Sequence, residues 1–179
     1  MKIPHPNFVI AAVCSLLVLA PARAETQILH YPTEDQSIFT IQAPGDWEVT
    51  GIDAVGEFGS LQSENGSVLQ FRAIECGSED DAIAEIDAIA ESTIAHLTGS
   101  FTDIKLGDVE ELEIEGMPAF QLIGDGKDEE GNDVRFLSAM IILGPTTVAE
   151  VWAAAYAEDL DSAQAVLGSF KPTSAAAAE

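Results

Sequence analysis

The sequence predicts one domain with an α+β fold, in which helices pack on a mainly antiparallel sheet. Three observations support this: strand-like segments separated by turn residues fill the first half, one helical pattern lies in the middle, and another lies at the end. The apolar fraction of 47% supplies enough material for a core, and 179 residues suit a single domain.

The first 24 residues have the features of an export signal. Lys2 precedes the apolar run 8–20, and Ala22-Arg23-Ala24 has the small-x-small pattern that signal peptidase cuts. The run is shorter than the roughly 20 residues that span a bilayer, which disfavours a membrane anchor. We therefore expect a cleaved signal peptide over residues 1–24, no membrane insertion after cleavage, and a periplasmic or secreted protein that begins at Glu25.

Strands and turns alternate over the first half of the expected domain, 25–172. The strand-like segments are residues 27–31, 37–42, 54–62 and 67–75. A polar turn, 32–36, separates the first two, and Pro44-Gly45-Asp46 interrupts the chain before Trp47. Glu64-Asn65-Gly66 separates the last two, and Asn-Gly between strands is a strong hairpin signal. These residues predict an antiparallel meander.

A helical pattern follows Ser78, a residue type that caps helix N-termini, and the acidic run 79–81 suits the positive end of the helix dipole. Apolar residues then recur at helical spacing: Ile83, Ile86, Ala90, Ile94 and Leu97. We expect an amphipathic helix that ends near Gly99, with this face packed.

The second half returns to strands, over residues 105–115, 119–124, 134–143 and 146–156. The third and fourth are strongly apolar, and the continuous Val, Ala and Trp content of 146–156 predicts a central strand covered on both faces. A final helix is expected over 158–170, with Leu160, Ala163, Leu167 and Phe170 on one stripe and Pro172 ending it. Residues 173–179 are expected to be a flexible tail.

Charge restricts the possible partners. Loss of Lys2 and Arg23 with the signal leaves 5 of the 7 basic residues beside 31 acidic ones, so the net charge changes from −24 to −26. Such a surface repels nucleic acid and anionic membranes. It either keeps the protein soluble in salt or attracts a basic protein partner or a divalent cation. Cys76 is the one cysteine after the signal, so no internal disulfide can form.

No catalytic, cofactor-binding or metal-binding residue is predicted. Beyond the signal, only His30 and His96 could serve as histidine bases, and no Gly-x-Ser-x-Gly motif, phosphate-binding loop or zinc-ligand spacing occurs. The loop 125–133 offers hard oxygen ligands that suit calcium, namely Asp125, Asp128, Glu130, Asn132 and Asp133. The EF-hand pattern fails there, because Asp133 replaces its glycine and Ala139 its final glutamate, so a solvated turn is favoured.

Three short motifs in order resemble the PsbP-like family. They are Phe39-Thr40-Ile41 leading through Pro44-Gly45-Asp46 to Trp47, Gly116-Met117-Pro118-Ala119, and the terminal helix ending in Ser169-Phe170. The resemblance covers about residues 38–171. It implies an α/β/α sandwich with two principal helices, as in Mog-like and bacterial DcrB-like proteins, and a non-enzymatic binding or assembly role. A carboxylate-based hydrolase or a calcium-binding periplasmic protein is the alternative.

Overall fold

The computed structural model describes residues 25–173, apart from the side chains of Glu79, Asp80 and Ile83. The expected signal peptide and residues 174–179 of the expected tail lie outside this range. The elements in chain order are β1 (Thr26–Tyr31), β2 (Phe39–Pro44), β3 (Glu48–Thr50), β4 (Gly59–Gln62), β5 (Val68–Glu75), α1 (Glu79–Ser100), β6 (Thr102–Leu106), β7 (Glu110–Ile114), β8 (Met117–Lys127), β9 (Asp133–Gly144), β10 (Thr147–Ala155), α2 (Leu160–Leu167) and β11 (Lys171–Pro172).

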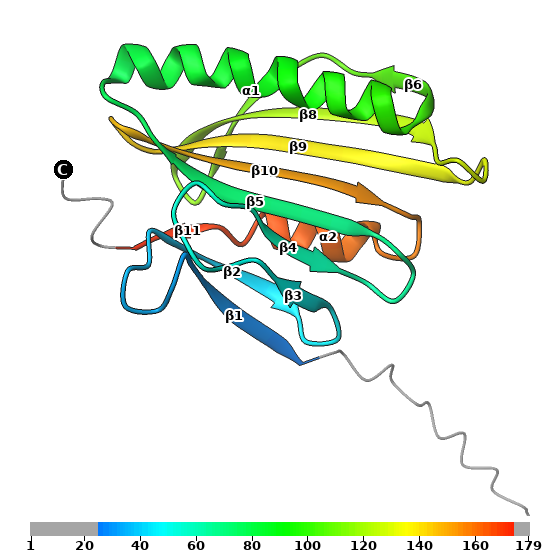
Figure 1. Cartoon of the computed structure of the whole chain (residues 1–179), viewed down its shortest axis with the longest axis horizontal. Coiled ribbons are helices and arrows are strands. Elements are labelled where there is room, and N and C mark those ends of the chain that lie inside the picture. The colour runs from blue at the N-terminus through cyan, green and yellow to red at the C-terminus, as the bar shows by residue number, and fades with distance from the viewer. Residues whose placement is uncertain (1–24, 174–179) are drawn as a thin grey trace, which may run out of the picture.

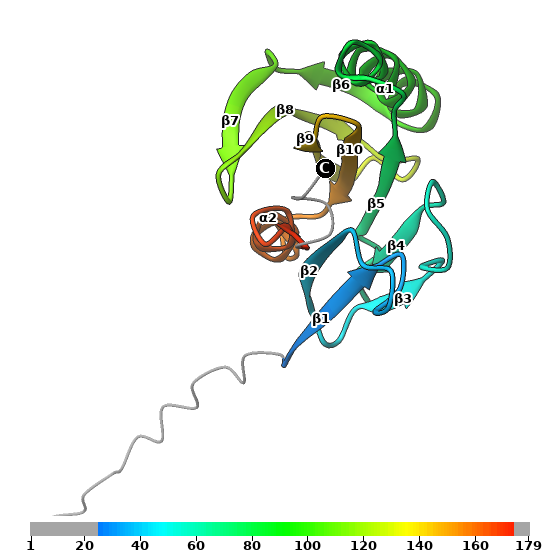
Figure 2. The same cartoon turned by 90° about the vertical axis from the view of Figure 1, so that its left-hand side faces the viewer.

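The strands form two antiparallel sheets. The large sheet has the order β3-β4-β5-β10-β9-β8-β6, with β7 also paired to β8, and the small sheet has the order β1-β2-β11. Helix α1 covers one face of the large sheet, whereas α2 and the small sheet lie on the other face (Figure 1, Figure 2). The predicted α+β fold with a mainly antiparallel sheet and two helices is therefore confirmed. Within residues 25–173, no helix combines the length and apolar character needed to cross a membrane.

The main core fills the space between the large sheet and the layer of α2 and the small sheet. Aromatic rings dominate it: Phe39 stacks on Tyr31 with ring centroids 4.9 Å apart and lies 4.8 Å from Phe170. Trp47 belongs to the same core and is 6% exposed. Burial of these rings ties β1, β2 and the C-terminal segment onto the large sheet.

Helix α1 begins as predicted. Ser78 is its N-cap, and the Ser78 hydroxyl accepts a hydrogen bond from the Asp81 N–H at 3.2 Å. Its packed face agrees with the expected stripe in part: Ile86, Ala90 and Leu97 pack as expected, but Ile94 is 38% exposed. Thr93 is buried in its place. Ile94 lies about 100° further around the helix than Thr93, away from the sheet. Among the described side chains of α1, the fully buried ones are Ala82, Ile89, Thr93 and Leu97.

The expected strand over 54–62 is wrong in its first half. Residues 51–58 form a loop, and only Gly59–Gln62 is extended as β4, paired with the unexpected short strand β3. The Tyr31 hydroxyl contacts the carbonyl oxygens of Ala54 and Glu57 at 3.1 and 2.6 Å. These carbonyls therefore bond to a side chain and not to a neighbouring strand.

The expected strand over 105–115 is also wrong, because it is two strands. Both β6 and β7 pair with β8, which is 11 residues long and extends beyond the predicted 119–124 at both ends. The Gly107 N–H, between the two, donates to the Ile123 carbonyl at 2.8 Å. The long strand β8 thus pairs with two short strands that follow one another in the chain.

The last helix is shorter than predicted. It ends at Leu167, not Phe170, and Lys171–Pro172 then pairs with β2 as β11. The Ser169 hydroxyl accepts a hydrogen bond from the Gln42 N–H at 2.8 Å. Pairing with the small sheet therefore ends the helix early, and Phe170 is buried in the core from the short connection between α2 and β11. The β4–β5 hairpin and the central position of β10 are as predicted.

Candidate functional site

The two histidines do not form a common site. His30 lies in β1 of the small sheet, where its Nδ1 is 3.3 Å from the Ser37 hydroxyl. His96 lies on α1, which covers the opposite face of the large sheet. Neither histidine pairs with a carboxylate among the described residues. They therefore cannot act together on one substrate.

The oxygen atoms of the 125–133 hairpin are directed largely at protein donors. Asp125 pairs with Arg135 at 2.8 Å, and Asp133 with Lys127 at 2.7 Å. Asp128 accepts hydrogen bonds from the N–H groups of Glu130 and Asn132, from the Asn132 side chain and from the Tyr156 hydroxyl.

The Asn132 side chain contributes most to holding the pKa of Asp128 down at about 2. Among the described residues, the Glu130 side chain forms no hydrogen bond with this hairpin. Among the described side chains, no three potential metal ligands cluster together.

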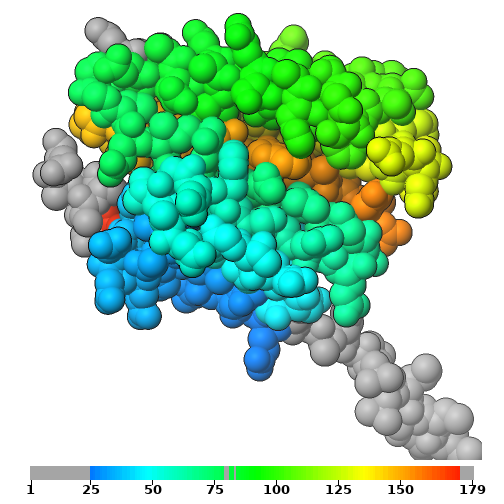
Figure 3. Space-filling view, in the orientation of Figure 1, coloured from blue at the N-terminus to red at the C-terminus, as the bar shows by residue number. Residues whose placement is uncertain are grey.

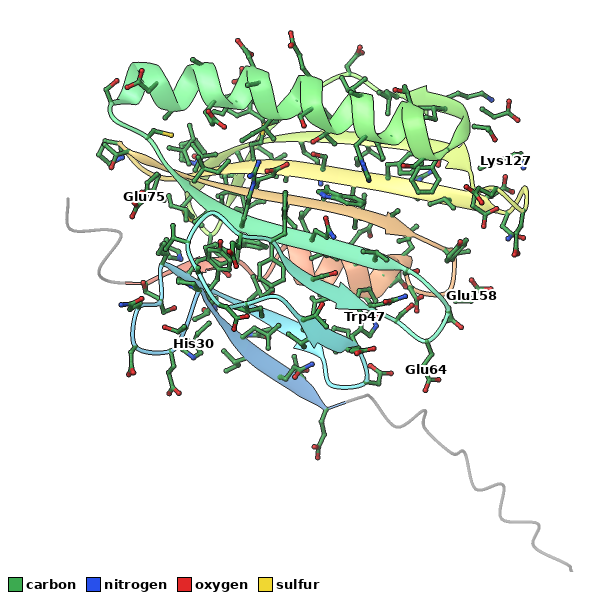
Figure 4. The ribbon with its side chains drawn as sticks, in the orientation of Figure 1. His30, Trp47, Glu64, Glu75, Lys127 and Glu158 are labelled. Atoms are coloured by element: carbon green, nitrogen blue, oxygen red, sulfur yellow. The ribbon has the colours of Figure 1, made fainter. Side chains whose placement is uncertain are left out.

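An acidic hollow of about 460 Å³ lies beside this hairpin. It is lined by Asn65, Glu130, Asn132, Asp133, Tyr156, Ala157 and Glu158. These residues come from three separate segments: the β4–β5 turn, the β8–β9 hairpin and the β10–α2 connection. Figure 4 shows Glu64, Lys127 and Glu158 at this same end of the molecule.

Hydrogen bonds hold the three segments of the acidic hollow together. Asp159 accepts from the Ser63 hydroxyl at 2.6 Å and from the Asn65 amide at 3.2 Å. Burial raises the pKa of Asp159, but the hydrogen bonds from Ser63, Ser67 and Asn65 outweigh it, so the pKa lies below its ordinary value. The Tyr156 hydroxyl donates to Asp128 at 2.8 Å and joins the hairpin to the end of β10. The hollow is therefore preorganised.

A second concave region lies between α1 and the large sheet, and we call it the β10 furrow. It has a volume of about 170 Å³ and is lined by Phe58, Gln70, Arg72, Ser92, Thr93, His96, Glu150 and Trp152. In the space-filling view, the surface of β10 is visible between α1 above and the β4–β5 region below (Figure 3).

An ion pair forms the floor of the β10 furrow. Arg72 and Glu150 are cross-strand neighbours in β5 and β10, and Arg72 Nε donates to Glu150 Oε2 at 2.6 Å. The Glu150 side chain is 5% exposed and that of Arg72 28%. Burial raises the pKa of Glu150, and Arg72 opposes that rise.

Aromatic groups flank this ion pair. The Arg72 guanidinium carbon lies 4.5 Å from the centroid of the Phe58 ring, and the rings of His96 and Trp152 are 5.2 Å apart. Arg72 and Glu150 are 78 residues apart in sequence, so no local pattern predicted their pairing. One signal could have revealed it: Glu150 is the only charged residue in the strand TVAEVWAAA, and a buried carboxylate requires a partner.

Cys76 lies just after β5 and is half-buried. Burial raises the pKa of its thiol, and the charges of Glu85 and Asp81 add to this. The thiol form is therefore favoured over the nucleophilic thiolate.

The architecture defines this chain as an α+β protein with a PsbP-like fold. Its structure resembles the solution structure of cyanobacterial PsbP (CyanoP) from Synechocystis sp. PCC 6803, with a TM-score of 0.57 and 12% identity over 88% of this chain and 99% of that one. It also resembles a protein from Bacteroides thetaiotaomicron VPI-5482, with a TM-score of 0.54 and 10% identity over 84% of this chain. This chain spans about half of that protein (49%). The sequence matches no protein-family model and no curated protein.

Proposed function

We propose that this chain is an exported, non-catalytic accessory protein that binds a protein partner of basic character. The PsbP-like fold and the expected signal peptide support this proposal. The narrower likeness to Mog-like and DcrB-like proteins, which rests on the short sequence motifs, forms part of the same proposal.

The observation that carries the proposal is the distribution of charge. Residues 25–173 contain five basic side chains, and four of them lie within 4 Å of a carboxylate, the exception being Lys105. The remaining acidic groups therefore produce a negative field that attracts a cationic surface and accelerates its association.

The acidic hollow is where we expect the partner to make contact. Glu130, Asp133 and Glu158 line it from two separate segments, and the bonds of Asp128 and Asp159 hold those segments in place. A preorganised site loses less conformational entropy on binding. Lysine or arginine side chains of a protein match its charge.

Catalysis is not part of the proposal, although the β10 furrow contains Ser92, His96 and Glu150. Activation of a serine requires a hydrogen-bonded relay from hydroxyl to base to carboxylate. Among the described residues, Glu150 bonds to Arg72, and no hydrogen bond joins His96 to Ser92 or Glu150. The raised pKa of Glu150 follows from its burial, and Arg72 opposes that rise.

Affinity capture with matched baits tests the proposal. The mature protein is compared with Glu130→Gln/Asp133→Asn/Glu158→Gln and with a control, Glu34→Gln/Asp35→Asn/Glu75→Gln, which removes the same charge elsewhere. Glu75 lies at the opposite end of the molecule from Glu158 (Figure 4).

We expect a basic exported protein to bind the native and control baits and to be lost from the first variant, with an affinity that falls as salt rises. Equal loss from both variants would show that net charge alone causes retention. Retention by all three baits would place the contact away from the hollow.

A further inference from the structure

The ion pair in the β10 furrow leaves polar atoms unused. Arg72 Nε is bonded to Glu150 Oε2, whereas Glu150 Oε1 and the two terminal nitrogens of Arg72 have no hydrogen-bond partner among the described residues. Among the described side chains, every fully buried polar atom has a hydrogen-bond partner. Since Glu150 Oε1 and the terminal nitrogens of Arg72 have none, they must be accessible to solvent. Since both residues line the furrow, one acceptor and several donors are available there side by side.

The walls beside these polar atoms are aromatic. Phe58 lies against the Arg72 guanidinium, and Trp152 lies beside the His96 ring. Gln70, Ser92 and Thr93 complete the lining. A small concave site with apolar walls and a few convergent polar groups is the usual form of a small-molecule site.

We propose that the β10 furrow binds a small zwitterion of the α-amino-acid class. The ligand carboxylate accepts hydrogen bonds from the terminal nitrogens of Arg72, the ammonium group donates to Glu150 Oε1, and the ligand side chain lies against Trp152 and Phe58. This site is separate from the acidic hollow and does not depend on the partner proposed above.

Charge spacing and size both favour this ligand class. An α-amino acid carries its two opposite charges on either side of one carbon atom, which suits a site where the carboxylate and guanidinium groups are direct neighbours, with Arg72 Nε 2.6 Å from Glu150 Oε2. A simple cation or anion would bind only Glu150 or only Arg72. A zwitterion forms hydrogen bonds with both charged groups, and such bonds are stronger than those between neutral groups. The volume of about 170 Å³ equals about six water molecules at roughly 30 Å³ each. We therefore expect the smaller amino acids to bind.

Titration calorimetry with defined ligands tests the inference. The mature protein is titrated with glycine, L-alanine, L-valine and L-leucine, and the tightest ligand is then compared with its N-acetyl derivative and its amide. We expect saturable binding of at least one amino acid. Each derivative should bind at least about tenfold more weakly, because each loses a hydrogen bond to a charged group. Undiminished binding of either derivative, or no saturable binding across the panel, would overturn the inference.

Two variants test whether the ligand binds in the furrow, so that the result does not depend on a single substitution that could disturb folding. Ser92→Leu fills the furrow from the exposed side of α1 and should abolish binding, whereas the control Ala88→Leu adds the same side chain one turn earlier, outside the lining residues. Arg72→Met/Glu150→Met removes both charges together, which proteins commonly tolerate, and should also abolish binding. Native affinity in Ser92→Leu with an unchanged melting temperature would place the ligand elsewhere. Partner capture by the acidic hollow should be unaffected in both variants.

Discussion

Removal of Arg72 gives the sharpest test of how the large sheet is stabilised. Arg72→Met keeps an apolar side chain against Phe58 but leaves Glu150 without its ion-pair partner. Breaking a buried pair from one side costs about 3–5 kcal/mol. Because the Arg72 side chain is 28% exposed, we expect the lower end of that range, about 3 kcal/mol. For a domain of this size, that lowers the melting temperature by about 6–12 °C.

The loss of stability caused by Arg72→Met should depend on pH in a defined direction. Burial raises the pKa of Glu150, and loss of Arg72 should raise it further. A carboxyl group whose pKa is higher in the folded state destabilises the fold while it is charged, and this penalty disappears as the pH falls through that raised pKa. The difference between Arg72→Met and the native protein should therefore shrink as the pH falls from 7 toward about 4.3, the ordinary glutamate value.

Urea unfolding of the native protein, Arg72→Met and Arg72→Met/Glu150→Met at several pH values measures this effect. The double variant should recover most of the lost stability at pH 7, because it has no unpaired charge. A stability difference that stays constant from pH 7 to 4, or a double variant as unstable as Arg72→Met, would refute the reasoning. Either result would mean that Glu150 is not held as a buried charge.

Four further measurements follow from the structure and the sequence. Trp47→Ala should lower the free energy of unfolding by about 3–5 kcal/mol, and an unchanged denaturation midpoint would place Trp47 outside the core. The low pKa of Asp128, about 2, contributes stability above about pH 3.9 that is lost as the pH falls through 2, so Asp128→Asn should show a weaker fall in stability between pH 4 and 2. An equally steep fall in the variant would contradict this. Sodium chloride should raise the melting temperature gradually by screening repulsion, with no saturable calcium shift at fixed ionic strength; a shift abolished by Asp128→Asn/Asp133→Asn would instead establish a calcium site. Intact-mass measurement of the exported protein should give a chain beginning at Glu25, and retention of residues 1–24 would refute the predicted cleavage.

Local chemistry allowed several elements to be predicted correctly. Ser78 caps α1 because its hydroxyl reaches an N–H only three residues away. The turn at Asn65-Gly66 lies between two paired strands, where the positive φ of Gly66, 89°, suits glycine. The uninterrupted apolar content of β10 indicates burial on both faces whichever strands flank it. None of these features requires knowledge of a distant partner.

The candidate sites were less accessible to prediction. The oxygen ligands of the 125–133 loop are visible in the sequence. The Tyr156 hydroxyl that binds Asp128, and the Ser63 and Asn65 groups that bind Asp159, are not. His96 was considered only as a possible histidine base, and its contact with Trp152 was not predicted. These contacts join segments between 28 and 96 residues apart, for which the sequence has no local signal.

The kind of element at most positions, the α+β class and the strongly acidic character can be read from the sequence alone, because each depends on composition or on spacing within a few residues. Only the tertiary structure decided that one strand-like run becomes two strands on β8, that Tyr31 holds the 51–58 loop, and that Arg72 lies opposite Glu150. The physical reason is that strand register and cross-strand neighbours arise from chain segments far apart in sequence, whose pairing is selected by burial of the whole sheet and not by any one segment.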